Sequence, residues 1–286
     1  MSRDRLDAPA RVERPVSKTS YYCAGTRMLD AHRPDPLVND AYAERFMGNE
    51  GKAVFEGFRH LSVPIGAHQV RCHLIDELVR ERFLADRETL VVLIGAGFDS
   101  RAFRLKGGRW LEIDDQSVIA RKEEVAPAVS CPNPLERIAI DFEREPLADK
   151  LAPYASDRIA VAVCEGLTMY LEPPEIEALA EALRANFPRH VLIADVMTRA
   201  FAERFGKKMS RALAAVGTGF RGIEDAPLDR LERLGYRRTY AQSLVARSLA
   251  LKRVPIPSFV RHFLWMLPTL RDGYRVAALE SAGVPK

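Results

Sequence analysis

Five short apolar runs, separated by segments with helical periodicity, constrain the fold of this chain most strongly. They have the length of strands and are rich in Val, Ile and Leu: TLVVLIG (89–95), RWLEID (109–114), RIAIDF (137–142), RIAVAVCEG (158–166) and HVLIADV (190–196). Between them, segments 116–129 and 174–187 carry apolar residues three and four apart, as amphipathic helices do. Continuous apolar strands that alternate with helices predict a parallel sheet covered on both faces. We therefore expect a doubly wound α/β fold.

The sequence pattern divides the chain into three parts. Residues 1–15 mix both charge signs with Pro and predict a flexible terminus. Residues 16–88 have helical character and predict an N-terminal helical cover. Residues 89–286 contain the strand pattern and predict the ligand-binding core, in which insertions after residue 196 would close over a substrate.

Charge and cysteine content argue against several classes of partner. The chain of 286 residues has a net charge of +4 from 43 basic and 39 acidic residues, which are interspersed, so we expect no nucleic-acid partner. Without an apolar run of roughly 20 residues we expect no membrane partner. Cys23, Cys72, Cys131 and Cys164 are widely spaced and lack a paired histidine spacing, so we expect no metal, reduced thiols and a cytoplasmic protein.

One apolar segment near the end of the chain, IPSFVRHFLWMLPTL, leaves alternatives open. Its large side chains could line a pocket, or could pack onto the sheet or onto a partner subunit in a homodimer: Phe259, Phe263, Trp265 and Met266.

The first apolar run leads directly into a glycine-rich turn, in the stretch VVLIGAGFDSRAFRL (91–105). Gly95, Ala96 and Gly97 follow the strand, and a helix is expected next. Glycines let a ligand approach the backbone closely, and a helix start offers free N–H groups. The turn therefore predicts a nucleoside-type ligand.

An acidic residue ends the second apolar run, close to 20 residues after the turn. Asp114 is placed there to accept hydrogen bonds from ribose hydroxyls. Asp115 is expected to cap the following helix instead, because it begins that helix.

The turn also discriminates between two cofactors. A dinucleotide fingerprint requires a third glycine where Ser100 stands. S-adenosylmethionine has no phosphates and tolerates Ser100, so the turn favours S-adenosylmethionine over NAD, with S-adenosylhomocysteine as the product.

Two further strand ends supply candidate ligand contacts. Asp141 and Phe142 could bond and pack against the adenine, or Asp141 could cap the next helix. Glu165 emerges at the carboxyl edge of the sheet, where ligands of such folds bind, and its charge would attract a cationic cofactor. Its alternative role is as a helix cap.

Four motifs taken together point to a known family. GAGFDSRAFRL, LEIDDQSVIARKEEV, AIDF and CEGLTMYLEPPEIEAL, with the opening segment VSKTSYYCAGTRMLDAHRPDPLVNDAYAERF, resemble the leucine carboxyl methyltransferase family, including its bacterial branch of O-methyltransferases linked to polyketide metabolism. The resemblance covers roughly residues 16–200.

The resemblance implies a class I methyltransferase fold. In that fold the seven-stranded sheet is mainly parallel, its last strand is antiparallel, and S-adenosylmethionine lies over the strand ends. Carried over by motif, the cofactor-binding residues are Gly95, Ala96, Gly97, Asp114, Asp141, Phe142 and Glu165, joined by Arg71, which would hold the cofactor's carboxylate. The family's N-terminal basic residue matches Arg27 or Lys18.

The expected reaction is methyl transfer to an oxygen of a small-molecule metabolite in secondary metabolism. A carboxylate acceptor requires no general base, and Arg27 and either Tyr21 or Tyr22 are candidates to orient it. A hydroxyl acceptor would require a base, for which the candidates are His68, His73 and His262. The rival functions are an NAD-dependent oxidoreductase and a non-catalytic sensor of S-adenosylmethionine.

Overall fold

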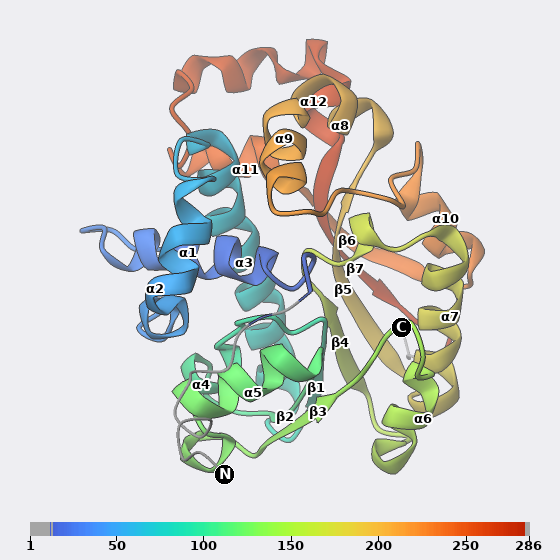
Figure 1. The fold of residues 1–286 in the computed structure, drawn as a ribbon. Helices are drawn as coiled ribbons and strands as arrows, with labels where there is room; N and C mark the ends of the chain where they lie inside the picture. The colour runs from blue at the N-terminus through green and yellow to red at the C-terminus, as the bar shows by residue number, and fades with distance from the viewer. Residues whose placement is uncertain (1–11, 13, 284–286) are drawn as a thin grey trace.

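A seven-stranded sheet forms the centre of the molecule (Figure 1). The computed structural model describes residues 12 and 14–283. Strands β1 to β7 span Leu90–Ile94, Arg109–Asp114, Leu135–Ala139, Ala160–Cys164, His190–Met197, Arg237–Ser243 and Tyr274–Glu280. Their order in the sheet is β3-β2-β1-β4-β5-β7-β6, and β7 is antiparallel to both of its neighbours while the other pairs are parallel. The predicted mainly parallel sheet with an antiparallel last strand is confirmed.

The central strands are apolar on both faces, which explains why helices cover both sides of the sheet. In β1, Val91 and Leu93 belong to one hydrophobic core, whereas Val92 and Ile94 belong to the other. Successive side chains of a strand point to opposite faces, so a continuous apolar run requires a covering layer on each face. The result is a three-layer α/β/α arrangement.

Two groups of helices form the covering layers (Figure 1). The first face packs against α1 (Thr19–Ala31), α2 (Ala43–Glu56), α3 (Ser62–Ala85), α4 (Arg101–Arg104), α5 (Gln116–Val125) and α11 (Leu244–Ala250). The second face packs against α6 (Leu147–Leu151), α7 (Pro173–Asn186) and α10 (Pro227–Arg233). Helices α1 to α3 therefore occupy the stretch for which the sequence predicted an N-terminal helical extension. The role of residues 16–88 as a cover stays a prediction, and most of segment 1–15 lies outside the described residues.

Two expected elements end earlier than their sequence patterns suggested. Strand β3 ends at Ala139, so Asp141 and Phe142 lie in the loop after it. Helix α5 ends at Val125, because Ala126 precedes Pro127 and the residue before a proline disfavours the helical conformation. The expected cap is present, since Asp115 accepts a hydrogen bond from the Ser117 backbone N–H at 2.9 Å.

The chain after β5 is less regular than the core. Helices α8 (Arg199–Phe205) and α9 (Lys207–Ala215) follow, and the 3₁₀ segment η5 (Ser258–Met266) leads into α12 (Pro268–Asp272). Leu264 of η5 is buried, but four of its large apolar side chains are between 53% and 69% exposed and line neither cavity described below: Phe259, Phe263, Trp265 and Met266. The alternative that these four side chains pack onto the sheet is wrong, because they are exposed and η5 lies at the edge of the molecule (Figure 1). A pocket lined by them, and their packing onto a partner subunit, stay predictions.

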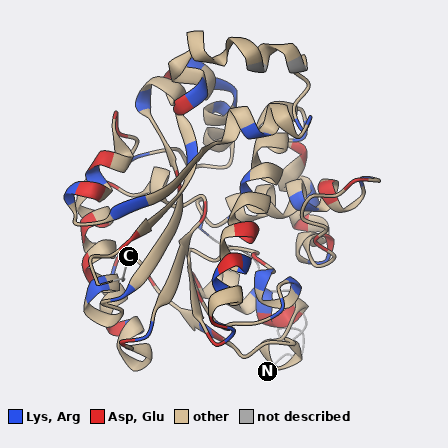
Figure 2. Cartoon of the chain, turned by 180° about the vertical axis from the view of Figure 1, so that it is seen from behind, with Lys and Arg blue, Asp and Glu red and all other residues tan. Residues whose placement is uncertain are grey.

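Charged residues are distributed over the helices and loops around an apolar sheet. Figure 2 shows basic and acidic segments intermixed on the covering helices, while the central strands are largely uncharged. No helix in the described part of the chain is long and apolar enough to cross a bilayer.

Candidate cofactor and acceptor site

The turn between β1 and α4 requires its two glycines. Gly95 and Gly97 have φ values of 66° and 49°, in the left-handed region that favours glycine. A Cβ atom added to Gly97 would lie 2.9 Å from the Ser20 Oγ. The N–H groups of Gly95 and Ala96 donate to the Ile113 carbonyl, at 2.9 and 3.1 Å, which ties the turn to the end of β2. The backbone is therefore held at the carboxyl edge of the sheet, where its two glycines present no side chain of their own.

Asp114 faces this turn from the end of β2. Its Oδ2 accepts from the Gly97 N–H at 2.6 Å and its Oδ1 from the Asp115 N–H at 2.6 Å. Burial raises the pKa of Asp114 to about 6, although both N–H groups favour its ionised form. Each oxygen keeps a second lone pair, so the carboxylate can still accept hydrogen bonds from a ligand's hydroxyls.

Two adjoining cavities meet at the glycine turn. The larger, of about 580 Å³, is lined by Asp114, Phe142 and the apolar face of α7 among others. The smaller, of about 80 Å³, is lined by segment 95–99 together with Arg27, Arg71 and Glu165. Both cavities share the same five wall residues: Thr19, Ser20, Ile94, Gly95 and Gly166. The larger volume falls in the range of small-molecule sites.

A buried ionic network surrounds Glu165 in the smaller cavity. Its Oε1 accepts from Arg71 Nε at 3.0 Å, and its Oε2 lies 2.7 Å from Arg101 Nη2. Burial alone would raise the pKa of Glu165, but the two guanidinium groups outweigh burial and hold that pKa well below its usual range. The alternative role of Glu165 as a helix cap is wrong, because the N-cap of α7 is Glu172.

Helix α1 presents one face to the smaller cavity. Thr19, Cys23 and Arg27 recur every four residues and line it, as the helical period places them on one side. Arg27 is 5% exposed; its Nε donates to Asp40 Oδ2 at 2.8 Å and its Nη2 to the Phe98 carbonyl. Lys18 lines neither cavity.

The two candidate tyrosines of α1 face away from the cavities. Tyr22 is buried against Phe58 and His68, and burial raises its pKa. The Tyr21 hydroxyl donates to Glu50 Oε2 at 3.0 Å. The geometry thus speaks against Tyr22 as an orienting group, because it lies on a different side of the helix from Arg27.

Of the two residues expected at the adenine, the structure places one in the wall of the larger cavity and the other outside it. Phe142 lines the larger cavity and is 42% exposed. Asp141 is not among the residues that line it; its Oδ1 lies 2.8 Å from Arg14 Nη2 and accepts from the Glu143 N–H. That ion pair lowers the pKa of Asp141. The alternative that Asp141 caps a helix is wrong, because α6 begins six residues later.

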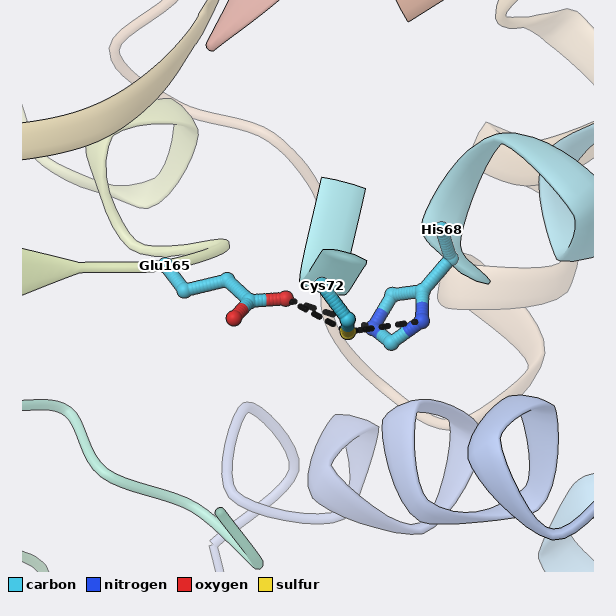
Figure 3. Close-up of side chains that lie close together, drawn as sticks. All are labelled: His68, Cys72 and Glu165. Carbon is cyan, nitrogen blue, oxygen red and sulfur yellow. Dashed lines mark hydrogen bonds and ion pairs between the residues drawn. The ribbon is translucent and has the colours of Figure 1, made fainter. Parts of the chain in front are cut away.

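His68, Cys72 and Glu165 lie close enough together to be compared with a metal site (Figure 3). Cys72 Sγ is 3.0 Å from Glu165 Oε1 and 3.6 Å from His68 Nδ1. However, Glu165 already faces two guanidinium groups, which disfavour a further cation. Burial also raises the pKa of Cys72 well above its usual value and lowers that of His68, so the thiol is protonated and the imidazole neutral.

Three residues to which the sequence analysis assigned no role complete the network: Asp195, Tyr274 and Arg101. Asp195 and Tyr274 both bond to Arg71 Nη1, at 2.9 and 2.8 Å. Arg101 donates to Asp76 Oδ1 at 2.6 Å, which holds it beside Glu165. One signal was present in the sequence: Asp195 is an acid inside the apolar run of β5, and a buried charge requires a partner.

Comparison with known proteins identifies the family of this chain. The leucine carboxyl methyltransferase family model matches residues 20–184. A Mycobacterium tuberculosis protein named "Putative S-adenosyl-L-methionine-dependent methyltransferase" is 31% identical over 224 residues, which cover 71% of this chain and 74% of that one. A protein of Frankia alni with the same description is 30% identical over 250 residues, covering 81% and 86%.

Two solved structures share the fold. The crystal structure of a Thermobifida fusca protein described as a "putative methyltransferase" has a TM-score of 0.58 at 14% identity. The match covers 97% of this chain and 96% of the Thermobifida fusca chain. A DUF574 family protein from Streptomyces avermitilis has a TM-score of 0.56 at 12% identity, with 93% and 97% covered.

The sheet order is that of the class I methyltransferase fold. The family model and the relatives described as S-adenosyl-L-methionine-dependent methyltransferases identify this protein as a methyltransferase whose methyl donor is S-adenosylmethionine. The residues present suit that cofactor, since the glycine turn leaves the backbone open and Asp114 keeps free lone pairs toward the larger cavity. The chain belongs to the leucine carboxyl methyltransferase family.

Proposed function

We propose that this protein methylates an oxygen of a small apolar metabolite, and that the acceptor is a carboxylate, such as that of a polyketide-type acid. The observation that carries this proposal is the presence of two arginines, Arg27 and Arg71, in the wall of one cavity beside the glycine turn. One guanidinium suits the cofactor's own carboxylate, and the other suits a second carboxylate.

The absence of an imidazole base from both cavity walls supports the same acceptor. Within the described residues, neither cavity is lined by a histidine. His73 pairs with Glu77 on the surface of α3, and His262 is exposed. A carboxylate is already ionised at neutral pH, so it can attack without losing a proton to the protein, whereas a hydroxyl cannot.

The protein's own residues then bind, orient and exclude water. When bound, the cofactor supplies a methyl group on a positively charged sulfur. Asp114 would accept hydrogen bonds from the ribose, Phe142 would pack on the adenine, and Arg71 would hold the carboxylate of the amino-acid end. Glu165, which is already paired with Arg71 and Arg101, would keep the Arg71 guanidinium in place. Arg27 would orient the acceptor through Nη1, because its described bonds use Nε and Nη2. Alignment and exclusion of water account for most of the rate enhancement in such a displacement.

Labelled methyl transfer tests the acceptor class. Purified protein is incubated with S-adenosylmethionine carrying a labelled methyl group and with matched pairs of compounds, each an apolar carboxylic acid and the alcohol of the same skeleton. The proposal expects esters from the acids and no product from the alcohols. Methyl ethers in place of esters would overturn the carboxylate assignment. Binding of the cofactor without turnover on any acceptor would instead support the sensor function.

Arg27→Lys tests the orienting role. Lysine keeps the charge beside Asp40 but loses the two-pronged geometry of guanidinium. The KM for an accepted acid should rise by about tenfold or more while the Kd for S-adenosylhomocysteine stays unchanged. Lys18→Ala is the control, because Lys18 lines neither cavity and its loss should alter neither constant.

A further inference from the structure

Asp195 and Tyr274 form a closed set of hydrogen bonds with Arg71. Asp195 lies two residues before the end of β5, and Tyr274 is the first residue of the neighbouring strand β7. Asp195 Oδ2 accepts from Arg71 Nη1 at 2.9 Å and from the Tyr274 hydroxyl at 2.7 Å. The Tyr274 oxygen in turn accepts from Arg71 Nη1 at 2.8 Å. All three groups bond to one another, so the guanidinium is held from one side.

The second oxygen of Asp195 holds a neighbouring part of the cavity wall. Oδ1 accepts from the Gly166 N–H at 2.6 Å. Gly166 has a φ of 67°, and a Cβ atom there would lie 3.1 Å from Arg71 Nη2. A single carboxylate, 0% exposed, therefore fixes both the arginine and the turn that carries Glu165.

These bonds leave one nitrogen of Arg71, a residue that lines the smaller cavity, without a carboxylate or hydroxyl partner among the described residues. Nε donates to Glu165 and Nη1 is used by Asp195 and Tyr274. The described contact of Nη2 is Cys23 Sγ at 4.0 Å, and Cys23 itself lines the smaller cavity. Nη2 is thus available to a ligand in a fixed orientation.

We infer that Asp195 and Tyr274 are positioning residues that aim Nη2 of Arg71 at the carboxylate of the cofactor's amino-acid end. The inference rests on the role proposed for Arg71 and is independent of the acceptor. Neither residue lines the cavity, so both act through Arg71.

The protonation state of Tyr274 agrees with this role. Burial raises the pKa of Tyr274 well above its usual value, despite the nearby charge of Arg71. The phenol therefore remains a donor to Asp195 across the pH range of an assay. Asp195 consequently keeps two hydrogen-bond donors at Oδ2.

Two ligands that share the adenosine part separate positioning from stability. S-adenosylhomocysteine carries the amino-acid end, and 5′-methylthioadenosine lacks it. Isothermal titration calorimetry gives the ratio of their affinities for each variant. Tyr274→Phe and Asp195→Asn should weaken S-adenosylhomocysteine by about three- to tenfold or more, as expected for lost hydrogen bonds to a charged group, and leave 5′-methylthioadenosine unchanged.

Tyr236→Phe is the matched control. Tyr236 is also a buried tyrosine, 4% exposed, and its hydroxyl lies 2.7 Å from His190 Nε2, in the core on the other face of the sheet. It lines neither cavity. Its loss should lower stability and leave the affinity ratio unchanged.

Arg71→Lys separates the two ways in which the inference can fail. The ratio compared is the affinity for S-adenosylhomocysteine divided by the affinity for 5′-methylthioadenosine. If this ratio falls in Arg71→Lys but stays at the wild-type value in Tyr274→Phe and Asp195→Asn, the inference is overturned and the role of Arg71 is retained. An unchanged ratio in Arg71→Lys would overturn the role of Arg71 and the inference with it. Equal losses for both ligands in Tyr274→Phe would show a general structural role, and this result also contradicts the inference.

Discussion

At the scale of single residues, the ribose contact proposed for Asp114 should make cofactor binding depend on pH. Its pKa is about 6 because burial disfavours the charged form, and a ribose should bind the ionised carboxylate. We therefore expect the Kd for S-adenosylhomocysteine to be level near neutral pH and to rise by up to about tenfold per pH unit below about pH 6. Calorimetric titrations across this range measure the effect.

Without the cofactor, the effect of Asp114 on the stability of the fold should have the opposite pH dependence: stability should increase at lower pH, whereas cofactor affinity should decrease. The pKa of Asp114 lies above its unfolded value of 3.8, so the ionised form is unfavourable in the fold. The contribution of Asp114 to the free energy of unfolding should therefore increase as pH falls from about 6 toward 3.8. Asp114→Asn should remove both effects and bind weakly at every pH. A wild-type Kd that does not change with pH would contradict the assigned contact.

Gly97 shows at the same scale why the turn carries glycine. Gly97→Ala places a Cβ 2.9 Å from Ser20 Oγ at a left-handed backbone position. We expect a loss of about 1–2 kcal/mol in the free energy of unfolding, measured with urea, together with a weaker Kd for S-adenosylhomocysteine. Gly235→Ala is matched in backbone strain, with a φ of 90°, but meets nothing within 4 Å, so its cofactor affinity should be normal.

At the scale of elements, one buried carboxylate joins α3 to α4. Asp76 is 0% exposed and accepts from Arg101 at 2.6 Å and from Arg104 at 2.7 Å. Removing it would leave two buried guanidinium groups less compensated, so Asp76→Ala should lower the free energy of unfolding by about 3–5 kcal/mol. The two arginines also lower the pKa of Asp76, against burial, so its stabilising contribution is present above pH 3.8 and is lost below it.

A surface ion pair provides the comparison for Asp76. Glu56 and Arg59 lie 2.8 Å apart with side chains 61% and 60% exposed. Glu56→Ala should change the free energy of unfolding by less than about 1 kcal/mol in the same urea titration. If Asp76→Ala and Glu56→Ala lowered the free energy of unfolding by similar amounts, burial would not be the reason for the stabilising effect of the Asp76 ion pairs.

At the scale of the whole molecule, the cofactor should stabilise the fold as any ligand of the native state does. S-adenosylhomocysteine at about 100 times its Kd adds roughly 2.7 kcal/mol to the free energy of unfolding, which should raise the Tm by several degrees in a thermal melt. NAD should leave the Tm unchanged, because the turn lacks a third glycine at Ser100. A shift with NAD alone would contradict the cofactor assignment.

Local sequence patterns were sufficient to predict which residues at strand ends lie together at one edge of the sheet. Gly95, Asp114 and Glu165 each follow an apolar run, and parallel strands bring such positions to one edge of the sheet. Arg27 and Arg71 came from the family resemblance, since an arginine on an amphipathic helix has no local signal that separates a ligand contact from solvent exposure. Tyr22 shows that closeness in sequence to a candidate site residue does not place a side chain in the site, because each step along a helix turns the side chain by about 100°.

The sequence by itself determined the alternation of strands and helices, the covered parallel sheet and the glycine turn at its carboxyl edge, because these depend on short-range periodicity and on the conformational freedom of glycine. Only the tertiary structure decided how the buried charges pair. Arg71 meets Asp195 and Tyr274 across 124 and 203 positions of the chain. No local pattern encodes such partners, because a buried charge is satisfied by whichever group the packing of distant elements brings within reach.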